Sequence, residues 1–154
     1  MSEANKEIVR KYQEAYNTNN LDTLGELLAP HWKTNAWPEG APQSLEMAKE
    51  VYQGILQSFP DIQFHTQQVV AEGEWVVQRH LVRGTFKGEM AGIPPTGKTV
   101  EVGGVSMFRI VDGKIVEHWG YSDDVGFWHQ CGVEVPEIML AFIHRAEQSG
   151  GDSA

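Results

Sequence analysis

Several features that define common protein classes are scarce in this sequence. There is one cysteine, Cys131, so the chain can form no internal disulfide and has no cysteine cluster for zinc. The six histidines are scattered and show no HExxH or HxxxH spacing, so we expect no metal site. No run approaches the roughly 20 apolar residues of a membrane-spanning helix, and the N-terminus MSEANKEIVRKY lacks an apolar signal core. These absences predict a soluble, cytoplasmic protein.

Positive charge is also scarce. The 12 Lys and Arg residues face 21 Asp and Glu residues, which gives a net charge of −9. Nucleic acid or an anionic membrane would be repelled by this mean field, and no basic run offsets it, so neither is an expected partner. The length of 154 residues fits one domain, which we place at residues 1–147. The tail QSGGDSA, residues 148–154, is expected to be disordered.

Apolar residues recur at helical spacing in the first part of the chain. Residues 6–16 carry a stripe of period 3.6, which predicts a first helix. Asp22 is the expected N-cap of a short second helix that Pro30 terminates. Ser44 is the expected N-cap of a third helix, which ends before Pro60. Helices are therefore predicted to precede every strand.

The pattern changes after residue 61. Residues 62–70, 75–86 and 99–111 are rich in β-branched and aromatic residues, which predicts strands. The dipeptide Asp112-Gly113 predicts a type I′ hairpin into a further strand, KIVEHW. A last helix is expected within residues 135–146. The order of helices first and antiparallel strands afterwards predicts an α+β fold.

The hairpin also predicts which side chains share a face. With a two-residue loop, Val111 pairs with Lys114, and counting outward places Phe108 opposite Glu117 and His118 on the other face. The residues predicted to share one face are Glu117, Trp119, Tyr121 and Asp123 on one strand and Val102, Gly104, Ser106 and Phe108 on its neighbour. Carboxylates among aromatics, opposite small residues, indicate a concave site with perturbed pKa values. A bulge at the nearby glycines would change this count.

The second half of the chain resembles a known family. Its GIPPTGK loop, the strand pair FRIVDGKIVEHW and the following DxxG are similar to those of SnoaL-like polyketide cyclases, also called ester cyclases. A thinner similarity covers LLAP and FPDI in the first half. The resemblance implies a nuclear transport factor 2-like fold, a cystatin-like α+β barrel. In that fold a cone-shaped, curved antiparallel sheet is wrapped by N-terminal helices around an apolar pocket, and the protein commonly dimerises through the sheet.

The resemblance also implies a reaction and a base. The family's catalytic aspartate matches Asp123, with Asp124 beside it as a reserve. A carboxylate can remove a proton from carbon between two carbonyls without a cofactor, and an intramolecular aldol closure can follow. The expected substrate is an apolar, polyketide-like small molecule. Supporting or substrate-binding roles are expected for Glu117, Trp119, Tyr121, Phe86 and Trp37.

Two positions depart from the family pattern. Histidines that members often carry in GTHxGE and after the LAP segment correspond to Phe86 and Asn35 here. His80 shares strand parity with Phe86, so it is expected to point into the same pocket and replace one missing donor. Without these family histidines the functional assignment rests mainly on the aspartate motif.

Other interpretations of the same residues stay open. Asp123 alone would suit a turn or helix cap, and His80 and His118 would suit packing or dimer contacts. Glu117 would suit a solvated charge at a strand edge or a partner of Arg79, Arg83 or Arg109. Three functions follow: a cyclase or an isomerase or hydrolase on the same fold, a non-catalytic module that binds an apolar metabolite, and an assembly role for the sheet face expected to carry His118, Met107 and Arg109.

Overall fold

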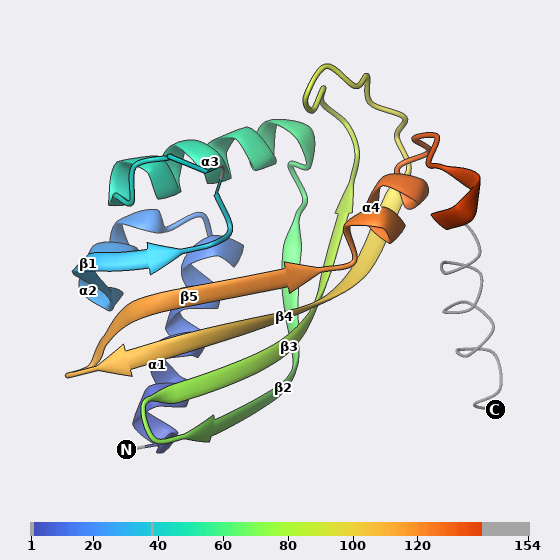
Figure 1. Ribbon diagram of the computed structural model, residues 1–154. Coiled ribbons are helices and arrows are strands. Elements are labelled where there is room, and N and C mark those ends of the chain that lie inside the picture. The colour runs from blue at the N-terminus through green and yellow to red at the C-terminus, as the bar shows by residue number, and fades with distance from the viewer. Residues whose placement is uncertain (1, 38, 140–154) are drawn as a thin grey trace, which may run out of the picture.

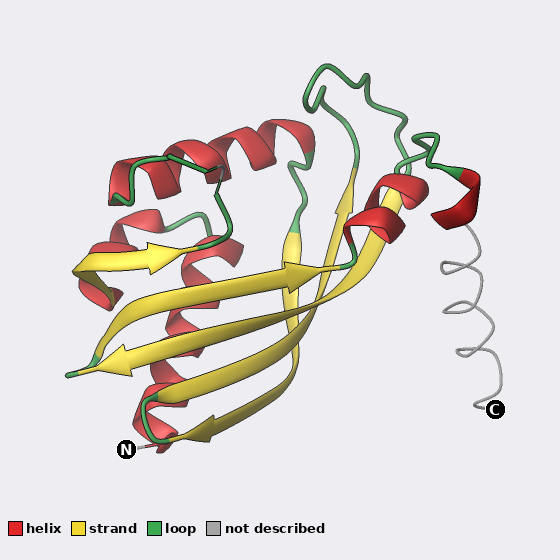
Figure 2. Cartoon of the chain, viewed as in Figure 1, coloured by secondary structure: helices red, strands yellow, loops and turns green. Residues whose placement is uncertain are grey.

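The computed structural model describes residues 2–37 and 39–139, and its chain forms a curved sheet with helices packed against one face (Figure 1). The strands lie in the order β1-β5-β4-β3-β2, which confirms the predicted α+β class. Figure 2 shows the helices gathered mainly on the concave side. The elements are α1 (Ser2–Asn17), the 3-10 helix η1 (Leu21–Thr23), α2 (Leu24–Leu27), β1 (Leu28–Thr34), α3 (Leu45–Ser58), β2 (Gln63–Glu72), β3 (Trp75–Thr85), β4 (Thr99–Val111), β5 (Lys114–Ser122) and α4 (Asp124–Gln130).

The two long helices follow the predicted apolar stripes. α1 buries Val9, Tyr12 and Ala15. The Ser44 hydroxyl accepts a hydrogen bond from the Met47 main-chain N–H at 3.1 Å, which confirms the predicted cap of α3. The predicted cap at Asp22 is wrong.

Asp22 lies inside η1, and its carboxylate forms an ion pair with Lys49 at 2.6 Å instead of capping a helix. Neither η1 nor α2 has a side-chain cap hydrogen bond. The short helical segment is held instead by its buried leucines, Leu21, Leu24 and Leu27.

β1 was not predicted, because Pro30 was interpreted as a helix terminator. The strand lies at the sheet edge and runs parallel to β5, with Thr34 paired to His118. An edge strand tolerates proline because one side of it needs no ladder hydrogen bonds. The sheet is therefore mixed, although its other strand pairs are antiparallel as predicted.

The hairpin between β4 and β5 confirms the predicted turn but not the predicted register. Asp112 and Gly113 have φ values of 49° and 75°, as a type I′ turn requires. The register then shifts between Ile110 and Arg109, so that Arg109, and not Phe108, lies opposite Glu117. Val116 is the extra residue of this β-bulge, and every β5 side chain beyond it lies on the face opposite to the predicted one.

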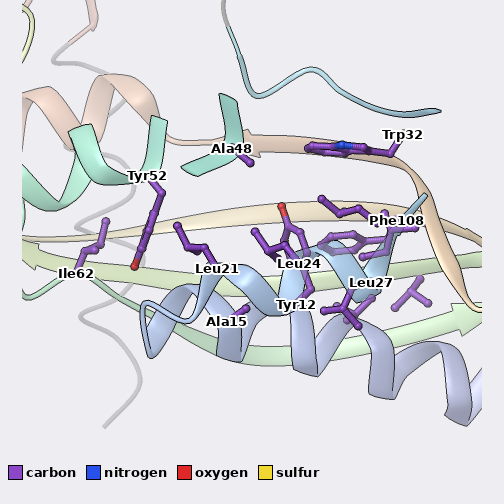
Figure 3. Packing of buried hydrophobic residues seen from close by; sticks show 14 of the residues in the cluster. Tyr12, Ala15, Leu21, Leu24, Leu27, Trp32, Ala48, Tyr52, Ile62 and Phe108 are labelled. Carbon is purple, nitrogen blue, oxygen red and sulfur yellow. The ribbon is translucent and has the colours of Figure 1, made fainter. Parts of the chain in front are cut away.

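The hydrophobic core fills the space between the helices and the concave face. Figure 3 shows Tyr12, Leu24 and Phe108 directed toward one another from α1, α2 and β4. The rings of Tyr12 and Phe108 pack edge to face at 5.1 Å. Phe86 is completely buried and stacks on Phe59 at 5.2 Å.

The predicted helix at 135–146, the domain end at 147 and the tail at 148–154 extend into or fall within residues 140–154, which lie outside the described residues. Within residues 2–37 and 39–139, no helix has the length and apolarity needed to cross a membrane.

Candidate functional site

A cavity of about 190 Å³ lies on the concave face of the sheet, between α1, α3 and the end of β1. An apolar cavity of about 150 Å³ is enough to hold benzene. Aromatic rings make up much of its wall. The lining residues that lie on helices, on β1 or in the loop after β1 are Tyr12, Gln13, Tyr16, Trp32, Thr34, Ala36, Trp37, Ala48, Val51, Tyr52 and Ile55, and those on the later strands are Phe64, Gln78, His80, Ser106, Phe108 and His118.

The polar groups of this wall carry no formal charge. Among the described lining residues there is no Asp, Glu, Lys or Arg. Burial raises the pKa of Tyr12 well above its ordinary value, and burial also raises the pKa of Tyr16, so both phenols are neutral at pH 7. A ligand would therefore meet apolar rings and neutral hydrogen-bonding groups.

His118 lies at the centre of the polar wall. Its Nδ1 is 2.9 Å from Thr34 Oγ1 and its Nε2 is 3.3 Å from Ser106 Oγ. The ring also stacks on Phe108 at 4.9 Å. Burial, with a smaller effect from nearby His80, lowers the pKa of His118 to about 4. The imidazole is therefore neutral at physiological pH.

His80 lies on β3 opposite Gly104 and lines the cavity, where the sequence placed it. A side chain at Gly104 would collide with it, because an added Cβ would lie 2.7 Å from His80 Nε2. The His80 Nδ1 atom is buried without a hydrogen-bond partner among the described residues. Burial lowers the pKa of His80, and the Gln78 main-chain carbonyl opposes only part of this effect.

A second polar cluster joins α1 to the sheet at the cavity wall. Gln13 Oε1 accepts hydrogen bonds from Gln78 Nε2 and from Thr66 Oγ1, the latter at 2.7 Å. Gln13 Nε2 donates to the main-chain carbonyl of Phe64 at 2.8 Å. These bonds fix the distance between α1 and β2–β3, and with it the width of the cavity.

The model of the SnoaL-like polyketide cyclase family matches residues 6–131. The chain belongs to this family. A cyclase for aklanonic acid methyl ester from Streptomyces sp. (strain C5) is 28% identical over 134 residues, which cover 84% of this chain and 83% of the relative. The nogalonic acid methyl ester cyclase of Streptomyces nogalater is 28% identical over 125 residues, which cover 80% and 93%.

Solved structures agree with the family and its fold. IdmH from Streptomyces antibioticus, a proposed polyketide cyclase, is 36% identical with a TM-score of 0.73, over 84% of this chain and 99% of that one. AclR from Streptomyces galilaeus is 28% identical with a TM-score of 0.75, over 88% and 100%, and its proposed activity is hydroxylation. Structural similarity therefore extends to relatives with different proposed chemistries.

Asp123, the predicted base of this SnoaL-like chain, lies at the end of β5 and outside the cavity lining. Its carboxylate is exposed and caps α4, because Oδ1 accepts a hydrogen bond from the Gly126 N–H at 2.8 Å. A larger residue at position 126 would force the Asp123 carboxylate out of its present position, since an added Cβ would lie 2.1 Å from Asp123 Oδ2. The DxxG motif thus has a local structural reason. Asp124 is also exposed and accepts a hydrogen bond from Ser122 Oγ at 2.6 Å.

Three other predicted site residues lie on the convex face of the sheet. The prediction that Glu117, Trp119 and Tyr121 line the cavity is wrong, because the bulge directs them outward. Glu117 forms an ion pair with Arg109 at 2.9 Å and accepts a hydrogen bond from Trp119 Nε1 at 3.3 Å. A pairing with an arginine across the sheet was one of the alternatives for Glu117, and of the three candidates, Arg79, Arg83 and Arg109, the partner is Arg109. The same bulge corrects the placement of His118, which lines the cavity and not the convex face.

Of the remaining predicted site residues, one lines the cavity and two do not. Trp37 lines the cavity and packs edge to face on Trp32 at 5.0 Å. Phe86 belongs to the core and is outside the cavity lining. Asn35 is outside it as well, and its amide binds the main chain of β5: Oδ1 accepts from the Gly120 N–H at 2.7 Å and Nδ2 donates to the Gly120 carbonyl at 3.3 Å.

Sequence reasoning missed most of the cavity wall. Tyr12 and Tyr16 were interpreted only as the apolar stripe of a helix. The bulge that brings His118 inside had one sequence signal, since the adjacent apolar pair Ile115-Val116 breaks strand alternation. Among the described residues, no group of three or more His, Cys, Asp or Glu side chains could hold a metal ion.

Proposed function

We propose that this protein is a cyclase-type enzyme that uses acid–base chemistry on an apolar, carbonyl-containing small molecule bound in the cavity. The observation that carries the proposal is the aromatic cavity with uncharged polar groups in its wall, in a chain of the SnoaL-like family. Such a cavity suits a flat, neutral molecule with carbonyl oxygens. The esters named for the curated relatives, aklanonic and nogalonic acid methyl esters, are the first substrates to test.

The proposed reaction is an intramolecular aldol closure. Asp123 takes a proton from a carbon between two carbonyls, and the resulting enolate carbon attacks a second carbonyl of the same molecule. Protonated Asp123 then returns the proton to the new alkoxide, so no proton is gained or lost. The Asp123 N–H donates a hydrogen bond to the Gly103 carbonyl at 3.2 Å, and Gly103 adjoins Gly104, the partner of the cavity residue His80. This main-chain link between Asp123 and the strand beside His80 supports the proposal.

The test is turnover of these esters by Asp123→Asn. Asparagine is as good an N-cap as aspartate, so the substitution removes the base but retains the cap of α4. We expect turnover to fall by about 10²-fold or more, the usual effect of a general base. Asp112→Asn is the matched control, because it removes the same charge in a turn where asparagine is equally suitable. Unchanged turnover in Asp123→Asn would refute Asp123 as the base.

A second candidate function is a non-catalytic module that binds the same kind of molecule. The position of Asp123 outside the cavity lining, where it already serves as a helix cap, favours this alternative. A binding module predicts that wild-type protein binds the esters without converting them, and that Asp123→Asn leaves the dissociation constant within about twofold.

For assembly, we propose a homodimer through the convex face. Four exposed apolar side chains form cross-strand pairs there, Met107 with Trp119 and Val105 with Tyr121. We call these four residues the convex patch. A contiguous exposed apolar patch on a sheet is typical of an interaction surface.

A further inference from the structure

Thr34, His118 and Ser106 form a continuous hydrogen-bonded chain across three neighbouring strands. Thr34 Oγ1 lies 2.9 Å from His118 Nδ1, and Ser106 Oγ lies 3.3 Å from His118 Nε2. Thr34 Oγ1 also accepts a hydrogen bond from the Ala36 N–H at 3.0 Å. All three side chains line the cavity, with Thr34 and Ser106 at the two ends of the chain.

The Thr34–His118–Ser106 chain always has one hydroxyl proton that makes no hydrogen bond within it. A neutral imidazole carries one N–H, and each hydroxyl carries one O–H, so three protons serve two internal contacts. If Nε2 holds the ring proton, it donates to Ser106 and Nδ1 accepts from Thr34, which leaves the Ser106 proton free. If Nδ1 holds it, the Thr34 proton is free. The tautomer of His118 therefore selects the end that can donate.

The free hydroxyl proton has no acceptor among the described residues, because the one further hydrogen bond of these two hydroxyls is accepted by Thr34 Oγ1 from the Ala36 N–H and uses no hydroxyl proton. Ser106 is buried and Thr34 is half-buried. A donor that is shielded from water and has no partner costs free energy, which a suitable ligand atom recovers on binding. The wall around the chain is aromatic and uncharged. These conditions suit a carbonyl or enolate oxygen attached to an apolar skeleton.

We propose that the Thr34–His118–Ser106 chain donates a hydrogen bond to a carbonyl oxygen of the bound molecule, with His118 setting which hydroxyl donates. The inference rests on the proposed function, because in that reaction the same oxygen gains negative charge when the enolate forms. A donor already in place at that oxygen stabilises the charge. The Thr34–His118–Ser106 chain supplies the hydrogen-bond donor that is missing because Asn35 and Phe86 replace the family histidines and neither lines the cavity. His118 acts through the hydroxyls as a positioning residue.

The test compares two probes of nearly equal shape, 2-acetylnaphthalene with a ¹³C-labelled carbonyl and 2-isopropenylnaphthalene, in which CH₂ replaces the oxygen. The full-length protein carries ¹⁵N-labelled histidine. With the ketone, we expect the bound carbonyl ¹³C signal to move downfield and the His118 nitrogen signals to move toward those of one tautomer. The alkene should not move the His118 nitrogen signals toward those of one tautomer.

The variants separate this role from a structural one. Thr34→Val combined with Ser106→Ala removes both donors at nearly constant shape, so ketone affinity should fall about fivefold, the fold-change of one hydrogen bond. Alkene affinity should stay within twofold. The single variant Thr34→Ser keeps a hydroxyl at this position and should retain the wild-type preference for the ketone.

An unchanged ketone-to-alkene ratio in the double variant would overturn the inference, as would His118 signals that respond identically to both probes. Loss of turnover in Asp123→Asn together with an unchanged ratio would refute this hydrogen bond and leave the proposed enzyme intact. Failure of both probes to bind would count against the cavity as the ligand site and so against both proposals.

Discussion

Replacing Gly104 by alanine should displace His80 and destabilise the protein, whereas the same change at the neighbouring Gly103 should not. An added Cβ at Gly104 would lie 2.7 Å from His80 Nε2 and 3.1 Å from the Tyr121 carbonyl oxygen. Ordinary contact begins near 3.4 Å, so the His80 ring must move by about 0.7 Å and the main chain at Tyr121 must also shift. Overpacking of this kind costs about 1–3 kcal/mol.

Gly103 is the matched control, because an added Cβ there meets nothing within 4 Å. Alanine at such a position typically stabilises by about 0.4–1 kcal/mol through the unfolded state. We therefore expect a gap of about 2 kcal/mol between the two variants in urea unfolding. The His80 ring signals in NMR should shift only in Gly104→Ala. Equal unfolding free energies with unchanged His80 signals in both variants would refute the close approach described for this site.

Two further predictions concern pH and assembly. The pKa of His118 is about 4 when folded and about 6.5 when unfolded, so the unfolded state binds more protons between these values and stability falls as pH drops from 6.5 toward 4. The free energy of unfolding should be lower by about 2 kcal/mol at pH 5 than at pH 7.5 because of His118. Urea unfolding of His118→Gln should lack this difference, and the same pH dependence in the variant and the wild type would contradict the prediction. Met107→Glu should halve the mass seen in sedimentation, whereas Gln57→Glu on α3 should not; a wild-type monomer would exclude the dimer.

Local rules accounted for much of the fold. Ser44 and the Asp112-Gly113 turn were correctly predicted because each acts through its own neighbours in sequence. β1 was missed because its partner, β5, lies about eighty residues later, and no local pattern encodes a parallel pairing at that distance. Pro30, taken alone, suits a helix end as well as an edge strand.

The site was less accessible to sequence reasoning than the fold. His80 was placed correctly because β3 pairs with β4 without a bulge along its whole length. His118 was placed on the wrong face because the count crossed the bulge at Val116. Tyr12 and Tyr16 could not be assigned to a cavity from periodicity alone, since the same stripe packs against a solid core or borders a space.

The bulge at Val116 also separates the length of β5 from the faces that its side chains occupy. Ile115 pairs with Ile110 and Glu117 pairs with Arg109, so Val116 has no partner on β4. Removal of Val116 alone would therefore leave Glu117 opposite Arg109 and His118 opposite Phe108, on their present faces. A register slip that paired Val116 with Arg109 at constant length would instead turn over every later side chain of β5, so that Glu117 would face the cavity and His118 would leave it. Which side chains form this part of the cavity wall is thus decided by the register of β5.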